Sequence, residues 1–354
     1  MPNGPHKRAG CLAVLLIVLA GSCAPQPEAA SRLATPTPAP PPTPRAAVPA
    51  VGQVRWELVP TSGPTPSPRL GATFAFLYAR GQLLLFGGRA VDQPLAELWR
   101  YDTERERWSL LTAAPSPPAR WGHAVAVDSR RRVMVIFGGQ GSDGTLNDLW
   151  AFDPLRLRWQ QLARDRVGPG PRVGACAAYD ETGDTILLAF GSTGSSLRND
   201  LWAYRPDSES WEELSPPLLR PPARQDAACL WDASGRRLYV FGGRGEEDLA
   251  DGWVFSLAPP GWTPLPSPLP PLALAATAVG DNGRGLIIGG QSAGGLLAEV
   301  WQLTFADGTL ARLHATGPPP RAGAAAVYSS DTRRFYLFGG AGPSPLDDFW
   351  SWAP

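Results

Sequence analysis

One short pattern recurs six times along the 354 residues of this chain: an apolar run, then an aromatic or aliphatic residue followed by two glycines. The copies begin 47 to 53 residues apart, and the third one, Phe190-Gly191-Ser192, is interpreted as carrying serine in place of the second glycine. A repeat at a fixed period of this length indicates that one structural unit is used over and over. The first residues of the six copies are Phe86, Phe137, Phe190, Phe241, Ile288 and Phe338.

Two series of tryptophans run in phase with the glycines. A tryptophan follows 12 or 13 residues after the start of each copy, and in four copies a second one stands nine residues further on. In the second repeat, apolar runs separated by turn residues predict strands at 124–127, 133–137, 149–152 and 159–162. Charged residues make up only 18% of the chain, which favours strands and turns over long charged helices.

A unit of four short strands that recurs about every 50 residues resembles the kelch repeat, and six units resemble a six-bladed kelch β-propeller. The resemblance covers residues 52–354 and implies an all-β fold with four antiparallel strands per blade. The sixth repeat ends before its outer strand, and Val54–Leu58, which contains Trp56, has the pattern of that strand. We therefore expect the N-terminal strand to close the last blade and leave no long unpaired edge.

The N-terminal 50 residues differ from the repeats. Residues 1–23 have the basic start and apolar run of an export signal, and the small residues before Cys23 resemble the lipobox of bacterial lipoproteins. This predicts a lipidated Cys23; the alternative is ordinary cleavage nearby and release of a soluble protein. Residues 24–50 hold nine prolines and are expected to form a disordered linker, followed by the propeller at 51–354. The expected location is extracytoplasmic, at the cell surface or in the periplasm, with membrane contact through the lipid only.

Arginines and acids form two further repeated series, which we call the lattice. An arginine stands just before five of the inner strands, and an acid stands two residues before the first tryptophan of every repeat. A ring that grips an anionic ligand is one interpretation, but repetition in every blade favours a structural network of arginine and carboxylate. The lattice residues are Arg69, Arg120, Arg172, Arg224 and Arg321, with Glu97, Asp148, Asp200, Asp251, Glu299 and Asp348.

The residues directly after the glycines differ from copy to copy, as a specific ligand would require. They are Arg89, Gln140, Arg244 and Gln291, and Trp121 is expected near the same rim. The other interpretation is that they are solvated loop tips. The loops that follow are short and have no aromatic residue, which argues against a stacking platform for sugars and against a closed catalytic pocket. If the rim binds a ligand, replacing Arg89 and Arg244 together by alanine should abolish binding.

Catalytic and metal chemistry finds little support in the sequence. Segments around Arg120 and Asp148 resemble the kelch domain of galactose oxidase, but its copper-radical chemistry needs two histidines, two tyrosines and a cysteine. Beyond residue 23 the chain has only His123 and His314, and no zinc, P-loop or hydrolase motif. Copper-radical oxidase activity is therefore not expected, and neither a metal nor a cofactor is predicted.

Three further expectations concern thiols and charge. Cys176 and Cys229 stand one register apart on equivalent strands, so they should point to opposite faces and remain buried free thiols. The arginine-rich hairpins at 130–132, 236–237 and 333–334 are interpreted as a solvated face of mixed charge or, alternatively, as a docking patch. The formal net charge is zero and Lys7 is the sole lysine, so nucleic-acid binding is not expected.

The sequence thus favours a monomeric, lipid-anchored binding or scaffolding module without enzymatic activity. Its ligand is expected at the rim, from a partner that is a protein or a glycan. The alternative is a glycan-active protein, either a sugar-binding module or a sugar isomerase or mutarotase.

Overall fold

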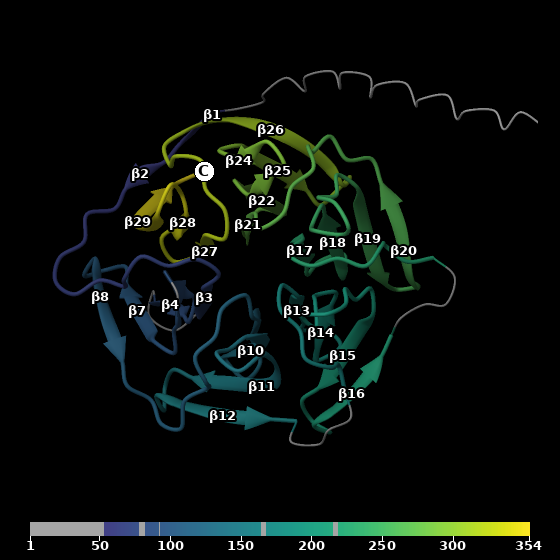
Figure 1. Ribbon diagram of the computed structural model, residues 1–354, viewed down its shortest axis with the longest axis horizontal. Helices are drawn as coiled ribbons and strands as arrows, with labels where there is room; N and C mark the ends of the chain where they lie inside the picture. Colours follow the sequence, from purple (N-terminus) through teal and green to yellow (C-terminus); the bar gives the residue numbers. More distant parts are fainter. Residues whose placement is uncertain (1–52, 78–81, 92, 164–167, 215–218) are drawn as a thin grey trace, which may run out of the picture. The chain divides into compact units, whose positions relative to one another are not determined.

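The structure is a computed structural model that describes residues 53–77, 82–91, 93–163, 168–214 and 219–354. Cys23, the predicted signal peptide and the predicted linker lie outside these residues. The described chain contains strands and no helices, and six sheets of four main strands stand around a common centre (Figure 1). Among the described residues no helix has the length and apolarity needed to cross a membrane. The six-bladed propeller that the repeats predicted is confirmed.

Each blade is a meander of antiparallel strands that runs from the central axis outward. Blades I to III contain β3 (Thr73–Leu77), β4 (Gln82–Phe86), β7 (Leu98–Asp102) and β8 (Arg107–Leu111); β9 (Ala124–Asp128), β10 (Val133–Gln140), β11 (Thr145–Asp153) and β12 (Arg158–Leu162); and β13 (Cys176–Asp180), β14 (Thr185–Ala189), β15 (Leu201–Arg205) and β16 (Ser210–Glu213).

Blades IV to VI follow the same order. They contain β17 (Ala228–Asp232), β18 (Arg237–Phe241), β19 (Gly252–Leu257) and β20 (Pro260–Leu265); β21 (Ala276–Val279), β22 (Arg284–Ile288), β25 (Val300–Thr304) and β26 (Thr309–Thr316); and β27 (Ala325–Ser329), β28 (Arg334–Ala341), β29 (Pro345–Trp352) and β2 (Glu57–Leu58). Two small ribbons lie in loops, namely β5 (Arg89–Ala90) with β6 (Gln93–Pro94) and β23 (Gln291–Ser292) with β24 (Gly295–Leu296).

The ring is closed by the N-terminal segment, which is shared between two blades. β1 (Gln53–Arg55) pairs in parallel with β26 of blade V, and β2 pairs antiparallel with β29 as the outer strand of blade VI. Between them Trp56 is 4% exposed, and its ring centroid lies 6.1 Å from that of Trp352. The predicted closure of the last blade is therefore confirmed, with an additional parallel pairing that the sequence did not indicate.

The tryptophans of the outer strands hold neighbouring blades together. Trp159 of blade II packs against Phe152 of its own sheet, at 5.1 Å between ring centroids, and against Phe86 of blade I, at 4.8 Å. In the same way Trp211 of blade III contacts Phe137 of blade II at 5.5 Å. The repeated aromatic residues therefore form a continuous apolar layer between the sheets, which explains why the two tryptophan series keep the same phase.

The two glycines after the second strand are required by the close approach of other backbone, from the next blade at the first glycine and from the same blade at the second. Gly138 and Gly139 have φ angles of +62° and +101°. A β-carbon on Gly138 would lie 2.5 Å from the carbonyl oxygen of Arg172, and one on Gly139 would lie 2.9 Å from that of Trp121. Both the backbone angle and the space exclude any larger residue without rearrangement.

The third repeat is shifted by one residue from the predicted alignment. Ala189 pairs with Cys176 as Phe137 pairs with Ala124, so Phe190 stands in the place of the first glycine, with a φ angle of +64°. Ser192 is therefore the counterpart of Gln140 and does not replace a glycine, contrary to the sequence interpretation. The error arose because the alignment matched Phe190 to the other aromatics by residue type, whereas strand pairing matches it by position.

Candidate binding site at the channel mouth

The lattice arginines are buried and fully engaged within the fold. Arg120 donates from Nη1 and Nη2 to the two carboxylate oxygens of Asp148, at 2.6 and 2.7 Å, and from Nη1 to the carbonyl of Gly138 at 2.9 Å. Its Nε donates to the carbonyl of Pro118 at 2.9 Å, and the side chain is 0% exposed. The same two-point pairing is present at Arg172–Asp200, Arg224–Asp251 and Arg321–Asp348, whereas Arg69 donates only to Oε2 of Glu97, at 2.6 Å.

The lattice acids that pair with a lattice arginine have pKa values below the ordinary range, and Asp148 is an example. Burial alone would raise the pKa of Asp148, but the hydrogen bonds and charge of Arg120 and the indole N–H of Trp150 hold the pKa below its ordinary value. Blade V departs from the pattern, because Leu272 donates its backbone N–H as the lattice arginines do and Glu299 pairs instead with Arg312, at 3.2 Å. Since these groups are paired inside the blades and the arginines are buried, the main role of the lattice is to complete contacts of the blades themselves.

The rim residues lie in a circle around one end of the central channel. Each pairs through its backbone with the residue that follows a lattice position: for example, Arg89 pairs with Leu70 and Gln140 with Trp121. The guanidinium carbon of Arg89 lies 5.0 Å from the ring centroid of Trp121. Arg244 donates to Asp248 at 3.2 Å, so both rim arginines have partners inside the chain.

The remaining rim positions are uncharged. Gln140 donates to the carbonyl of Gly141 and accepts from Thr145, at 3.1 Å each. Gln291, Ser192 and Ala341 occupy the same place in three other blades. The structure thus brings Arg89 and Trp121 together and distributes the other predicted rim residues around the circle.

A ring of backbone hydrogen bonds closes around the axis just inside the rim, and we call it the axial ring. One residue from each blade donates its N–H to the carbonyl of its counterpart in the neighbouring blade, at 2.8 to 2.9 Å, and the six bonds join end to end. All six residues have φ angles between +56° and +67°. They are Gly71, Gly122, Gly174, Asp226, Leu274 and Gly323.

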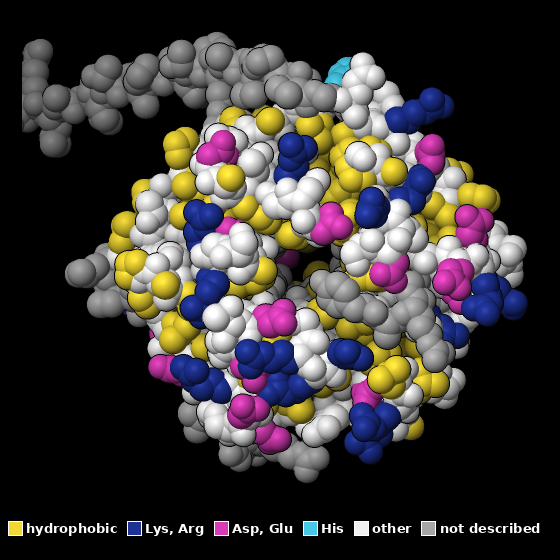
Figure 2. All heavy atoms as spheres, turned by 180° about the vertical axis from the view of Figure 1, so that it is seen from behind, with side chains coloured by type: hydrophobic (Ala, Val, Ile, Leu, Met, Phe, Trp, Pro, Cys, Tyr) yellow, Lys and Arg dark blue, Asp and Glu magenta, His cyan; other side chains and the backbone are white. Residues whose placement is uncertain are grey.

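The axial ring and the residues after it line a cavity of about 130 Å³, which we call the channel mouth. Alanine occupies the position after the ring residue in five blades, and His123 occupies it in blade II. A further cavity of about 300 Å³ shares seven of these lining residues and extends along the inner strands. Figure 2 views the molecule from behind Figure 1 and shows the opening of the central channel on the face of the arginine-rich hairpins, with basic and acidic side chains interspersed around it.

His123 is used inside the fold. Its Nε2 lies 2.7 Å from Oγ1 of Thr73, its ring packs edge-on against Phe86, and the side chain is 4% exposed. Burial, assisted by the charge of Arg120, lowers its pKa to about 3, so the imidazole is neutral. His314 is exposed on β26, the outer strand of blade V. The two histidines therefore lie in different blades, His123 just before β9 and His314 within β26, and they do not form one site.

Cys176 and Cys229 form a disulfide, which contradicts the prediction of two free thiols. Their Cα atoms are 6.0 Å apart, on the inner strands of blades III and IV. The two side chains do point to opposite faces of equivalent strands, as the register indicated. In a ring of blades, however, each sheet packs its front surface against the back surface of the next sheet. Two side chains on opposite surfaces of equivalent strands therefore meet at the junction between the two blades.

Asp226 is the residue of this region that the sequence analysis missed. Its Oδ2 accepts a hydrogen bond from Nε2 of Gln225 at 2.8 Å, and its side chain lines the channel mouth. Burial raises its pKa above the ordinary value; Gln225 and the charge of Arg244 oppose this rise, and Asp248 adds to it. A signal was present: four repeats read arginine, any residue, glycine, whereas the fourth reads Arg224-Gln225-Asp226.

The opposite end of the inner strands carries the arginine-rich hairpins, which tie neighbouring blades together. Arg131 of blade II donates to both carboxylate oxygens of Asp184 in blade III, at 2.7 and 2.8 Å, and also pairs with Asp128. Arg236 of blade IV reaches Asp180 of blade III in a similar way. The predicted mixed charge is present, and much of it is engaged in contacts between blades.

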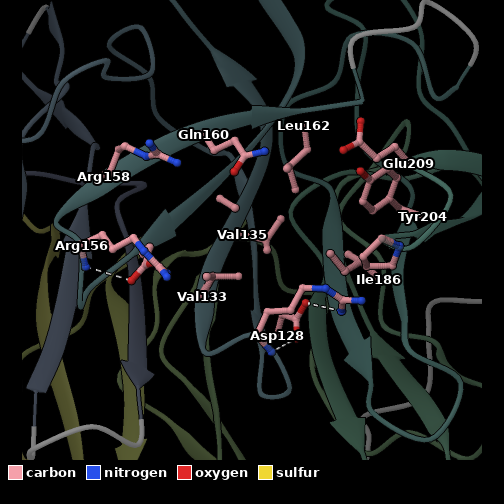
Figure 3. Close-up of a pocket in the computed structure, with 14 residues that line it drawn as sticks. Asp128, Val133, Val135, Arg156, Arg158, Gln160, Leu162, Ile186, Tyr204 and Glu209 are labelled. Carbon is pink, nitrogen blue, oxygen red and sulfur yellow. Dashed lines mark hydrogen bonds and ion pairs between the residues drawn. The ribbon is translucent and has the colours of Figure 1, made fainter.

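A groove of about 340 Å³ lies between blades II and III, away from the channel mouth (Figure 3). Its floor is apolar and includes Val135 and Ile186, and Tyr204 stands at one end, where burial and the charge of Glu209 raise its pKa to about 12. Arg156 pairs with Asp153 at the edge. Three acids and three arginines line this groove, so it has no excess of charge with which to select a ligand.

Comparisons with known proteins agree with this architecture. Residues 45–229 and 218–354 match the sequence profile of the KLHDC2/KLHL20/DRC7 Kelch-repeats domain. The chain belongs to the kelch-repeat family. It is 34% identical over 198 residues to multiple epidermal growth factor-like domains protein 8 of Homo sapiens, covering 53% of this chain and 7% of that protein.

Two other relatives show the same partial coverage. The chain is 33% identical over 208 residues to tip elongation aberrant protein 1 of Schizosaccharomyces pombe, covering 57% of this chain and 18% of that protein. It is 30% identical over 268 residues to Adagio protein 3 of Arabidopsis thaliana, covering 68% of this chain and 42% of that protein. The chain thus spans less than half the length of these relatives.

Proposed function

We propose that this kelch propeller is an extracytoplasmic, lipid-anchored module that binds a partner protein at the channel mouth and its rim. The observation that carries the proposal is the contrast within each repeat. The lattice is nearly the same in every blade, whereas the rim positions hold arginine, glutamine, serine or alanine, and two of the six ring positions depart from glycine to aspartate or leucine. A surface whose scaffold is uniform and whose side chains differ can recognise an asymmetric partner, and kelch repeats are an interaction fold.

Two features support the extracytoplasmic location. The signal-like N-terminus ends at Cys23, and the disulfide between Cys176 and Cys229 is of a kind that persists in oxidising compartments and is rare in the cytosol. Replacing Cys23 with serine should release the protein from the membrane fraction or stall its processing. A wild-type protein recovered in the soluble fraction, with Ala24 or a later residue at its N-terminus, would show that the anchor is wrongly assigned.

Partner binding at the rim can be tested by crosslinking in intact cells. A photoreactive phenylalanine analogue at Gln291 would lie at the rim, and the same analogue at Arg158 would lie on the outer strand of blade II as a matched control. The expected result is a discrete protein adduct from position 291 and none from position 158. Equal adducts from both positions, or none from the rim, would overturn the proposal.

The glycan alternative has its own readout. If the purified full-length protein binds a defined set of glycans on an array while position 291 yields no protein adduct, the sugar-binding interpretation replaces the present one. The groove between blades II and III would then be the first place to look, because its polar side chains surround an apolar floor.

A further inference from the structure

Within the axial ring, blade IV places a carboxylate where the other blades have none. Four of the six ring residues are glycine, and the two exceptions are Asp226, with a φ angle of +56°, and Leu274, with +57°. Left-handed backbone is unfavourable for residues with a β-carbon, although aspartate tolerates it better than most. Asp226 therefore occupies a position for which glycine is the better choice on stability alone, and strained positions of this kind cluster at functional sites.

The carboxylate of Asp226 is oriented for an external donor. Gln225 satisfies Oδ2, whereas within the described chain Oδ1 accepts no hydrogen bond. Oδ1 lies directly against the backbone of Gly174, where a β-carbon would collide with it, so the glycine of blade III provides the space for this side chain. Among the residues that line the channel mouth, Asp226 alone carries a carboxylate.

The charges around Asp226 favour a cation. The loop 244–250 of the same blade carries three acids, Glu246, Glu247 and Asp248, and one arginine, Arg244. Arg244 is held by Asp248 at 3.2 Å and donates no hydrogen bond to Asp226. Blade I, which lies across the ring, presents Arg89 on the indole of Trp121. The mouth is therefore polarised, with its negative side at blade IV.

The size of the mouth sets the kind of group that fits. A cavity of about 130 Å³ is below the ~300–1,000 Å³ of sites for drug-sized ligands. It suits the charged end of one long side chain, whose methylene groups would lie against the rim while the charged end reaches the ring. We propose that Asp226 is the anchor for an arginine or lysine side chain of the partner protein, inserted into the channel mouth. This inference rests on the proposed function, because it specifies which chemical group of a protein partner the mouth recognises.

The test uses the full-length protein in detergent and a phage-displayed library of random heptapeptides as the probe. Selection on the wild type should enrich peptides that contain arginine or lysine. In a selected arginine peptide, changing that arginine to citrulline should weaken binding about tenfold or more, as expected for a lost charge-assisted hydrogen bond. Asp226→Asn should cause the same loss for the arginine peptide and no further loss for the citrulline peptide.

Two controls separate recognition from folding. Asparagine tolerates a left-handed backbone, so Asp226→Asn should fold with an unchanged or higher melting temperature. Glu106 is also an acid in left-handed backbone, with a φ angle of +50°, but it lies outside the channel mouth. Glu106→Gln should therefore leave arginine-peptide binding within twofold of the wild type. Loss of binding in both variants would overturn the assignment to Asp226.

The outcomes also distinguish this proposal from the proposed function. If the enriched peptides lack basic residues, or if Asp226→Asn binds the arginine peptide as tightly as the wild type, the cation site is overturned while partner binding at the rim stands. If nothing is enriched and the crosslinker at Gln291 captures no protein, both are overturned.

Discussion

Arg224 and Asp226 stand two residues apart in blade IV, and the surroundings of their side chains differ in almost every respect. Arg224 is buried, paired with both oxygens of Asp251 at 2.7 Å, and has counterparts in four other blades. Asp226 has one hydrogen bond from a neighbouring side chain and no acidic counterpart in the axial ring. The pKa of Asp251 is lowered by its partners despite burial, whereas burial raises the pKa of Asp226.

The comparison separates two kinds of position in a repeated fold. Residues that recur in nearly every blade complete contacts of the unit itself, so they follow from the fold. A residue that departs from the repeat and makes the fold less stable must be retained for another reason, and a binding role is the simplest one. Four predictions test whether the lattice and the channel mouth differ in this way.

The largest effect is expected at the lattice. Arg120→Ala removes a fully buried arginine and leaves Asp148 without its main partner, so the free energy of unfolding should fall by about 3–5 kcal/mol. Urea denaturation followed by tryptophan fluorescence would measure the loss. Adding Asp148→Asn should recover part of it, because the unpaired carboxylate is then removed. A loss below about 1 kcal/mol would show that this lattice pair contributes no more to stability than a surface ion pair does.

A loss of similar size is expected at Trp56, which supplies the repeat position that the C-terminal end of blade VI lacks. Trp56→Ala should lower the free energy of unfolding by about 3–5 kcal/mol, as other buried tryptophan-to-alanine changes do. Deletion of residues 24–50 is the control and should have almost no effect, since that segment is predicted to be a disordered linker. Equal thermal stability of Trp56→Ala and the wild type would remove the physical basis of ring closure through this residue.

The disulfide should contribute an intermediate amount, because it joins two blades whose cysteines are 53 residues apart in the sequence. Replacing Cys176 and Cys229 together with alanine should lower stability by about 2–4 kcal/mol. The direct check compares denaturation midpoints with and without a reductant, and adding the reductant should have no effect on the double variant. Two titratable thiols in the unreduced protein beyond residue 23 would contradict the bond.

These features differ in how far the sequence could reveal them. The strands of blade II were predicted within a few residues, because turn residues and apolar runs are local signals. The disulfide was missed because its two cysteines meet across a junction, and register in one sheet says nothing about which faces meet. Phe190 was misplaced because a bulky residue in a left-handed position breaks the residue pattern while the backbone keeps its path.

The channel mouth was harder still to foresee. Arg89 and Trp121 were both assigned to the rim, but their contact at 5.0 Å depends on the closeness of blades I and II. In the sequence, Asp226 stands out because it replaces the glycine that follows two residues after the lattice arginine in four other repeats. Only the ring of backbone hydrogen bonds, however, shows that this position lies at the axis. A repeat alignment made by strand position would have found it.

The smallest predicted effect concerns the stability of the axial ring, and its pH dependence identifies its cause. The folded-state pKa of Asp226 is raised above that of the unfolded chain, so its contribution to stability is largest when the carboxyl is protonated and is lost as pH rises through the raised pKa. Asp226→Asn should therefore stabilise the protein at about pH 7.5, by about 1 kcal/mol or less. This gain should shrink toward pH 4, with Arg244 and Asp248 as the charged neighbours that set the midpoint.

Leu274→Gly is the matched control for this measurement, because it changes a left-handed ring residue that carries no titratable group. Whatever its effect on the denaturation midpoint, that effect should be the same at both pH values, whereas the effect of Asp226→Asn should not. The pKa values of Asp148 and Asp251 are shifted in the opposite direction, and both residues are present in the wild type and in the variants, so they do not mask the comparison. If the gain in stability of Asp226→Asn does not depend on pH, then the strained backbone, and not the burial of the charge, is what lowers the stability at this position. This result would argue against a buried carboxylate at Asp226 that is stabilised by binding a cation.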